Sequence, residues 1–130
     1  MRKLITSDVF KMARIIKEAK VKGAITEIFK SKAGIKADIK ESDSEDVKEA
    51  KRKALDEEQK AAGFEAVMTV LEACSTEKLE EMFYEFFGGI VEKTPDAVRK
   101  QSLEVTIEEI KAIVENNNIA NFFKLAGQSA

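Results

Sequence analysis

The chain has 130 residues, of which 44% are hydrophobic and 35% are charged; this length and composition fit one globular domain that buries a core without metals or disulfides. Its single cysteine excludes an internal disulfide and is typical of a reducing compartment. No apolar run approaches the ~18 residues that cross a bilayer, and no signal-peptide pattern is present, so we expect a cytoplasmic protein that enters no membrane.

The charges are unevenly distributed along the chain. The net charge is −2, yet residues 1–35 carry nine Lys/Arg and three Asp/Glu, whereas residues 36–130 carry 13 Lys/Arg and 21 Asp/Glu. Such asymmetry is typical of a nucleic-acid-binding arm, or of a basic helix that docks on an acidic one in the same chain or a neighbouring subunit. Because the basic excess is modest and lacks interleaved aromatics or an arginine cluster, nucleic acid is the less favoured partner.

Residues 8–20 are predicted to form the first helix. Ser7 is a suitable N-cap, and Asp8 suits the positive end of the helix dipole. A second, short helix is predicted over residues 24–30. The apolar stripe of the first helix has the spacing i, i+3, i+4 and i+7, and it consists of Val9, Met12, Ala13, Ile16 and Ala19.

The middle of the chain is polar and then helical. Residues 31–45 contain few large apolar side chains and are predicted to form a flexible loop. A long helix is predicted to follow. Its first part, residues 46–60, is rich in Glu, Lys and Ala, so it favours helix but buries little and is expected to be exposed. Its second part, from Phe64 to Cys74, carries an apolar stripe for the core, and Gly63 is the expected weak point between the two parts.

The stretch "LEEMFYEFFGGIVEKTPDAV", residues 79–98, holds four aromatic residues within five positions. Ser75 or Thr76 is predicted to cap a helix here, with its glutamates opposite the apolar face. Gly88 and Gly89 are expected to end or loosen this helix, since glycine readily takes the left-handed cap conformation. The stripe consists of Leu79, Met82, Phe83, Phe86, Phe87 and Ile90.

Three more helices are predicted towards the C-terminus. Thr94 and Pro95 are start signals for a short helix up to residue 100. Another helix begins at Ser102, and the asparagines at 116–118 stop it and cap the last one. The inner face of the penultimate helix is predicted to be Leu103, Ile107, Ile110 and Val114, and that of the last helix Ile119, Phe122, Phe123 and Ala126.

These elements predict the fold class. The sequence shows no alternating strand pattern of useful length and no internal repeat. We therefore predict a single all-α domain over residues 1–130, a compact bundle of five to seven helices with a polar mobile loop and one long, partly exposed helix.

The sequence offers no reaction chemistry. It contains no histidine, which removes the commonest general base and metal ligand. Cys74 lies on an apolar helix face and is interpreted as a small hydrophobe. Carboxylate pairs such as Glu81 with Glu85 lie on polar helix faces, and no phosphate-binding GxxxxGK[ST] pattern is present. We expect no enzyme activity, no catalytic residue, no metal and no cofactor.

Binding is the remaining class of function. Two interpretations of the aromatic residues stay open: all of them pack inside, or one edge of their stripes is exposed as a groove for an amphipathic segment or for self-association. Tyr84 lies off its stripe beside Glu80 and Glu81, and Phe10 lies off the first helix's stripe beside basic residues. Tyr84 and Phe10 are therefore candidates for interface contacts.

Three stretches together resemble the tail assembly chaperones of long-tailed phages and prophages of Gram-positive bacteria. They are "DVFKMARIIKEAKVKGAITEIF", "GFEAVMTVLEACSTEKLEEMFYEFFGGIVEKTPDAVRKQSLEV" and "NNNIANFFKLAG". With the polar insert around residues 31–60 they span nearly the whole chain. The shared features are packing and capping signatures rather than catalytic motifs.

The resemblance implies a non-enzymatic role. Proteins of this family coat the helical tape measure protein before the tail tube polymerises, help to recruit tail tube subunits, self-associate, and are absent from the finished virion. It implies the tape measure protein, the tail tube protein and further copies of the chain as partners, and the apolar stripes as contacts. On this basis Phe83, Tyr84 and Phe87, with Phe122 and Phe123, are expected to line the binding face. The alternatives are a small regulator that binds nucleic acid through its basic first helix, and a self-associating helical protein without a client.

Overall fold

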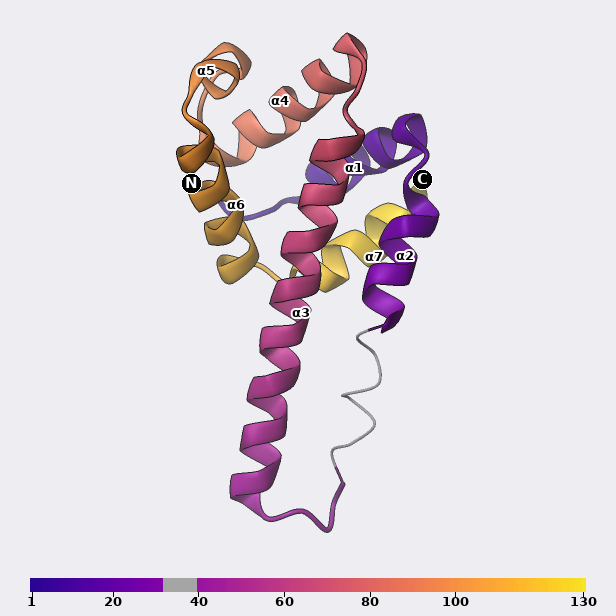
Figure 1. Cartoon of the computed structure of the whole chain (residues 1–130), viewed down its shortest axis with the longest axis vertical. Coiled ribbons are helices and arrows are strands. Elements are labelled where there is room, and N and C mark those ends of the chain that lie inside the picture. Colours follow the sequence, from indigo (N-terminus) through magenta and orange to yellow (C-terminus); the bar gives the residue numbers. More distant parts are fainter. Residues whose placement is uncertain (32–39) are drawn as a thin grey trace.

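The computed structural model describes residues 1–31 and 40–130. Within these ranges the chain forms seven helices and no strand, which confirms the predicted all-α bundle (Figure 1). The mobile loop predicted over residues 31–45 falls mostly outside the described residues. In chain order the helices are α1 (Thr6–Ala19), α2 (Lys22–Ser31), α3 (Glu45–Ala73), α4 (Glu77–Val91), α5 (Pro95–Lys100), α6 (Leu103–Asn116) and α7 (Ile119–Ser129).

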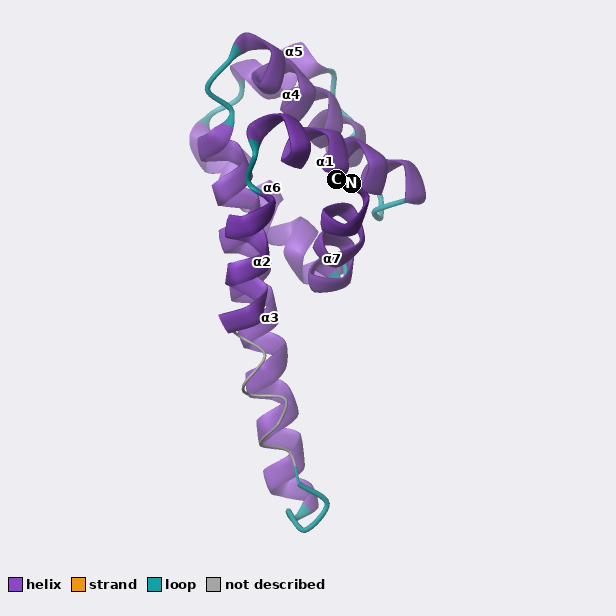
Figure 2. Ribbon diagram, turned by 90° about the vertical axis from the view of Figure 1, so that its right-hand side faces the viewer, coloured by secondary structure: helices purple, strands orange, loops and turns teal. Residues whose placement is uncertain are grey.

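Helices α4 and α7 supply the aromatic centre of the bundle. α7 packs against α1, α2 and α3, while α4 packs against α1 and α5, and α6 packs against α3 (Figures 1 and 2). The predicted stripes of α1, α4 and α7 face this centre and are buried apart from half-buried Val9, Ala19 and Met82. Rings from different helices meet directly, as in the pair Phe86–Phe122, whose centroids are 6.0 Å apart. Burial of these stripes supplies the main drive for folding, since each buried large side chain contributes ~1.5–3 kcal/mol.

The first half of α3 extends away from the other helices (Figures 1 and 2). Ser44 caps this helix, accepting a hydrogen bond from the Val47 amide at 3.2 Å. Just before the cap, the Asp43 carboxylate accepts hydrogen bonds from the Lys40 amide at 2.9 Å and from the Lys51 ammonium at 2.8 Å. Residues 46–60 are mostly exposed, as their composition predicts. This half of α3 forms a charged arm beside the packed bundle.

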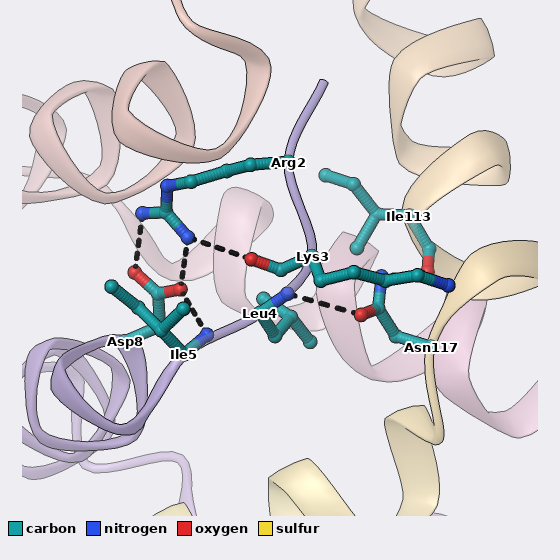
Figure 3. Close-up of polar contacts among 7 residues, drawn as sticks. All are labelled: Arg2, Lys3, Leu4, Ile5, Asp8, Ile113 and Asn117. Atoms are coloured by element: carbon teal, nitrogen blue, oxygen red, sulfur yellow. Dashed lines mark hydrogen bonds and ion pairs between the residues drawn. The ribbon is translucent and has the colours of Figure 1, made fainter.

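The N-terminal segment starts α1 differently from the prediction. α1 begins at Thr6 with Ile5 as its N-cap, so the prediction that Ser7 caps it is wrong. Asp8 performs the capping: its carboxylate accepts a hydrogen bond from the Ile5 amide at 2.9 Å (Figure 3). The Asp8 amide donates to the Ile5 carbonyl at 3.0 Å. The Arg2 guanidinium binds both oxygens of the same carboxylate, at 2.7 and 3.0 Å.

Asp8 is fully buried. Burial by itself raises the pKa of Asp8, but the hydrogen bonds from Arg2 and the Ile5 amide, with the positive charges of Arg2 and Lys11, outweigh it and hold that pKa below its ordinary value. The same segment joins distant helices. The Arg2 amide donates to the Ile90 carbonyl at 3.0 Å, and the Leu4 amide donates to Asn117 Oδ1 at 3.0 Å (Figure 3). The segment therefore ties α1 to α4 and to the turn between α6 and α7.

Two glycines act through packing rather than as helix breaks. α3 continues through Gly63, where an added Cβ would lie 2.1 Å from Ile119 Cγ2, so Gly63 is a close-contact site with α7 and not a weak point. α4 likewise continues through Gly88 and Gly89 to Val91, and the left-handed cap falls on Glu92, so the prediction that the glycine pair ends α4 is wrong. At Gly88 a Cβ would lie 2.7 Å from the Lys93 carbonyl oxygen, which folds back over the helix end.

The inner face of α6 differs from the prediction at two positions. Ile110 and Val114 are buried and Ile107 is half-buried, but Leu103 is 65% exposed. Ile113, absent from the predicted stripe, is buried. α6 packs against α3, and its first turn lies outside the buried core, so the apolar periodicity continues beyond the buried surface.

Candidate binding groove

Four of the aromatic residues expected at a binding face are core residues. Phe83, Phe87 and Phe123 are each 1% exposed, and Phe122 is 6% exposed. Phe83 and Phe87 stack on each other with centroids 5.4 Å apart, and Phe122 meets Phe123 edge to face at 5.5 Å. The expectation that these four rings line an exposed face is therefore wrong for this fold, and the alternative, that they pack inside, is confirmed.

Tyr84 is half-buried, and its polar groups are occupied within the chain. Its hydroxyl donates to Glu80 Oε1 at 2.5 Å, and this hydrogen bond, together with burial and the negative charge of Glu80, raises the pKa of Tyr84 to about 12. The Arg99 guanidinium lies 5.2 Å from the ring centroid and pairs with Glu81 and Asp96. Tyr84 thus holds α5 against α4, and we assign it a structural role.

Phe10 is the one predicted contact residue that is exposed. Its side chain is 51% exposed on the outer face of α1, with Arg14 and Lys17 one and two turns further along the same face. Both cations are exposed and have no ion pair among the described residues. We call this set the α1 outer face. It is a small basic surface with one aromatic residue at its start.

One groove in the described part of the chain was not predicted. It is a groove of about 700 Å³ between α2, the middle of α3 and α7, which we call the α2–α3–α7 groove. Its floor is apolar, because Phe29 of α2 lies against Phe123 of α7 with ring centroids 5.8 Å apart, and Ile25 and Leu55 flank them. Its volume falls in the range of ligand sites, ~300–1,000 Å³.

The rim of the groove is polar and basic. Four side-chain amides line it, from Gln59, Asn118, Asn121 and Gln128. Three lysines complete the rim, namely Lys22, Lys30 and Lys124, and none of them forms an ion pair among the residues that the structure describes. No Asp or Glu of the described ranges 1–31 and 40–130 is among the lining residues.

The sequence held a weak signal for this groove. Leu55 is an isolated large apolar residue in the otherwise charged first half of α3, and it is half-buried at the groove. Phe29 lies on the short second helix and is half-buried at the groove. Neither observation could identify the third wall, because α7 begins 64 residues after Leu55.

Cys74 does not supply a nucleophile. It is half-buried, its thiol donates to the Val70 carbonyl at 3.2 Å, and burial, with the nearby charge of Glu80, raises its pKa to about 11. The thiolate is the reactive form of cysteine, and a raised pKa favours the unreactive thiol.

The residues that the structure describes contain no cluster of three or more metal-ligating side chains. Over the same ranges, no helix combines the length and the apolar composition needed to cross a bilayer.

Comparison of the chain with protein-family models, curated proteins and solved structures finds no match. The α2–α3–α7 groove is consequently assessed on its own geometry. Among the described residues, this groove combines an apolar floor with a rim of amides and lysines.

Proposed function

We propose that this protein is a non-enzymatic phage tail assembly chaperone that holds an amphipathic helical segment of the tape measure protein in its α2–α3–α7 groove. The observation that carries the proposal is the groove itself. It has a volume of about 700 Å³, lies between three helices, and combines an apolar floor with a rim of polar side chains. Helices lay their apolar face into such grooves through side chains at i, i+3, i+4 and i+7. The resemblance described above supports the choice of client.

The charged arm of α3 fits this role. Residues 46–60 are mostly exposed and carry charges of both signs, which favours solubility of a complex whose client is apolar. Many copies bound along one long client would gain avidity although each groove binds weakly. The proposal includes self-association of such copies and recruitment of tail tube subunits to the coated client.

Co-expression with the tape measure protein encoded beside its gene tests the proposal. We expect the tape measure protein to be soluble and to co-elute only when this protein is present. Leu55→Asp places a charge on the groove floor and should abolish the effect. Val47→Asp is the matched control, because Val47 is an exposed apolar residue on the same helix outside the groove. A tape measure protein that precipitates regardless, or equal loss in both variants, would contradict the proposal.

The α1 outer face supports a second candidate function. An exposed phenylalanine beside unpaired cations can stack on bases while the cations contact phosphates. In that case Arg14→Glu with Lys17→Glu would remove binding to single-stranded nucleic acid, and binding by the unchanged protein would weaken steeply with added salt. Client binding through an apolar groove has no such steep dependence.

A further inference from the structure

The α2–α3–α7 groove is basic, whereas the protein as a whole carries a negative net charge. The chain has a net charge of −2, yet the lining residues that the structure describes include three lysines and no carboxylate. Lys22 and Lys30 are eight residues apart on α2, about 12 Å along the helix axis. Lys124 comes from α7. All three are exposed and have no ion-pair partner among the described residues, so their charges are available to a ligand.

The geometry of the groove favours a helical ligand over an extended one. Its walls are helices whose interior backbone groups are already bonded within each helix, and the described chain has no strand edge to pair with an extended peptide. A helix satisfies its own backbone hydrogen bonds and presents only side chains. The amides of Gln59, Asn121 and Gln128 can both donate to and accept from such side chains.

We infer that the groove selects an amphipathic helix whose apolar stripe is flanked by glutamate or aspartate. This inference rests on the proposed function and adds the charge pattern of the segment that is bound. The apolar stripe covers Phe29 and Leu55, while its acidic flanks reach Lys30 on one helix and Lys124 on another. Charge complementarity of this kind selects among partners of equal hydrophobicity and excludes basic ones.

Three labelled peptides of about five helical turns test the inference by fluorescence anisotropy. They share one leucine stripe and carry Glu, Gln or Lys on both flanks. Exposed ion pairs contribute ~0.2–1 kcal/mol each, so three of them favour the Glu peptide over the Gln peptide by roughly tenfold. We expect the Lys peptide to bind weakest. The advantage of the Glu peptide should shrink as salt is added.

Charge reversal in the protein localises the effect. Lys30→Glu with Lys124→Glu should abolish the preference for the Glu peptide and favour the Lys peptide. Arg14→Glu with Lys17→Glu on the α1 outer face is the matched control, because it changes the net charge equally and should leave the preference intact. Circular dichroism and urea unfolding of both variants show that each is folded. An equal loss of preference in the control would overturn the inference.

The Gln peptide separates failure of the inference from failure of the proposed function. If it binds and Leu55→Asp abolishes binding, but the Glu peptide binds no better, the groove holds helices without charge selection and only the inference fails. If no peptide binds, and the Lys30→Glu and Lys124→Glu variant instead loses self-association, the groove receives a second copy of the chain. That result overturns both.

Discussion

Replacing Gly63 by alanine tests a close contact between α3 and α7. The added Cβ would lie 2.1 Å from Ile119 Cγ2 and 3.1 Å from both Ile119 Cβ and Cγ1, whereas carbon atoms normally approach to ~3.5–4.0 Å. Ile119 is buried and branched at Cβ, so it cannot move aside by rotating a long chain. α3 and α7 must therefore separate locally.

Two opposed contributions determine how much Gly63→Ala changes the free energy of unfolding. Overpacking a filled core costs ~1–3 kcal/mol. Alanine in a helix interior is favoured over glycine by ~1 kcal/mol. We expect Gly63→Ala to lower the free energy of unfolding by about 1–2 kcal/mol, measured as a reduced urea midpoint at an unchanged m-value.

Two variants make the test specific to the contact. Gly23→Ala in α2 has no atom within 4 Å of the new Cβ, so it should leave stability unchanged or raise it by up to ~1 kcal/mol. Ile119→Ala removes Cγ2 and Cγ1 and keeps only Cβ, at 3.1 Å from the new methyl group, so in that background most of the cost of Gly63→Ala should disappear. The reasoning is refuted if Gly63→Ala is as stable as the unchanged protein, or if its cost persists beside Ile119→Ala.

Three further predictions concern titration, reactivity and backbone conformation. Asp8→Asn should lower the unfolding free energy at pH 7 by about 3 kcal/mol, because it breaks the buried pair with Arg2. The difference in unfolding free energy between the variant and the unchanged protein should shrink as the pH falls below about 4. The folded pKa of Asp8 lies below its ordinary 3.8, so the unchanged protein loses the stabilisation from the pair as Asp8 is protonated. A difference that stays constant with pH would contradict this account. Iodoacetamide should alkylate Cys74 at neutral pH on the order of 100-fold more slowly than an unhindered thiol, because its pKa is about 11, and mass spectrometry showing rapid modification would disprove the assignment. Lys20 has φ 59°, so Lys20→Gly should raise the thermal midpoint through a gain of ~0.5–1 kcal/mol, and an unchanged or lower midpoint would contradict the left-handed cap.

Much of the fold is encoded locally and could be predicted. The apolar stripe of α4 with its glutamates opposite, the Thr94–Pro95 start of α5 and the asparagine cap of α7 each depend on residues within a few positions of one another. Thr94 and Asn118 accept the expected hydrogen bonds from Ala97 and Asn121.

The errors arise where distant residues decide the outcome. α1 begins at Thr6 because Asp8 is held by Arg2, and Arg2 is held by the carbonyl of Ile90. The glycine pair of α4 does not end the helix, because the following chain folds back against Gly88. The periodicity of a helix sequence shows which of its faces is apolar. Only tertiary packing shows how far along the helix that face is buried.

The candidate site was missed for the same reason. The sequence directed attention to the densest aromatic cluster, and those rings fill the core. The groove is lined by Leu55, Phe29 and residues of α7, which lie on three separate helices and stand out in no single segment. In the sequence, Lys22 and Lys30 belong to a general excess of basic residues in the N-terminal part of the chain. Lys124 lies at the other end of the chain, so the sequence did not group it with them.

Site-specific cross-linking tests the central claim most directly. In a Cys74→Ala background, a photoreactive maleimide is attached at Thr26→Cys, on the groove rim, or at Glu72→Cys, an exposed position of α3 outside the groove. Each protein is then irradiated with the co-purified tape measure protein. If the groove binds the client, cross-links to the tape measure protein form from position 26 and not from position 72. Equal cross-linking from both positions, or cross-linking from position 72 alone, would contradict the claim that the α2–α3–α7 groove is the binding site.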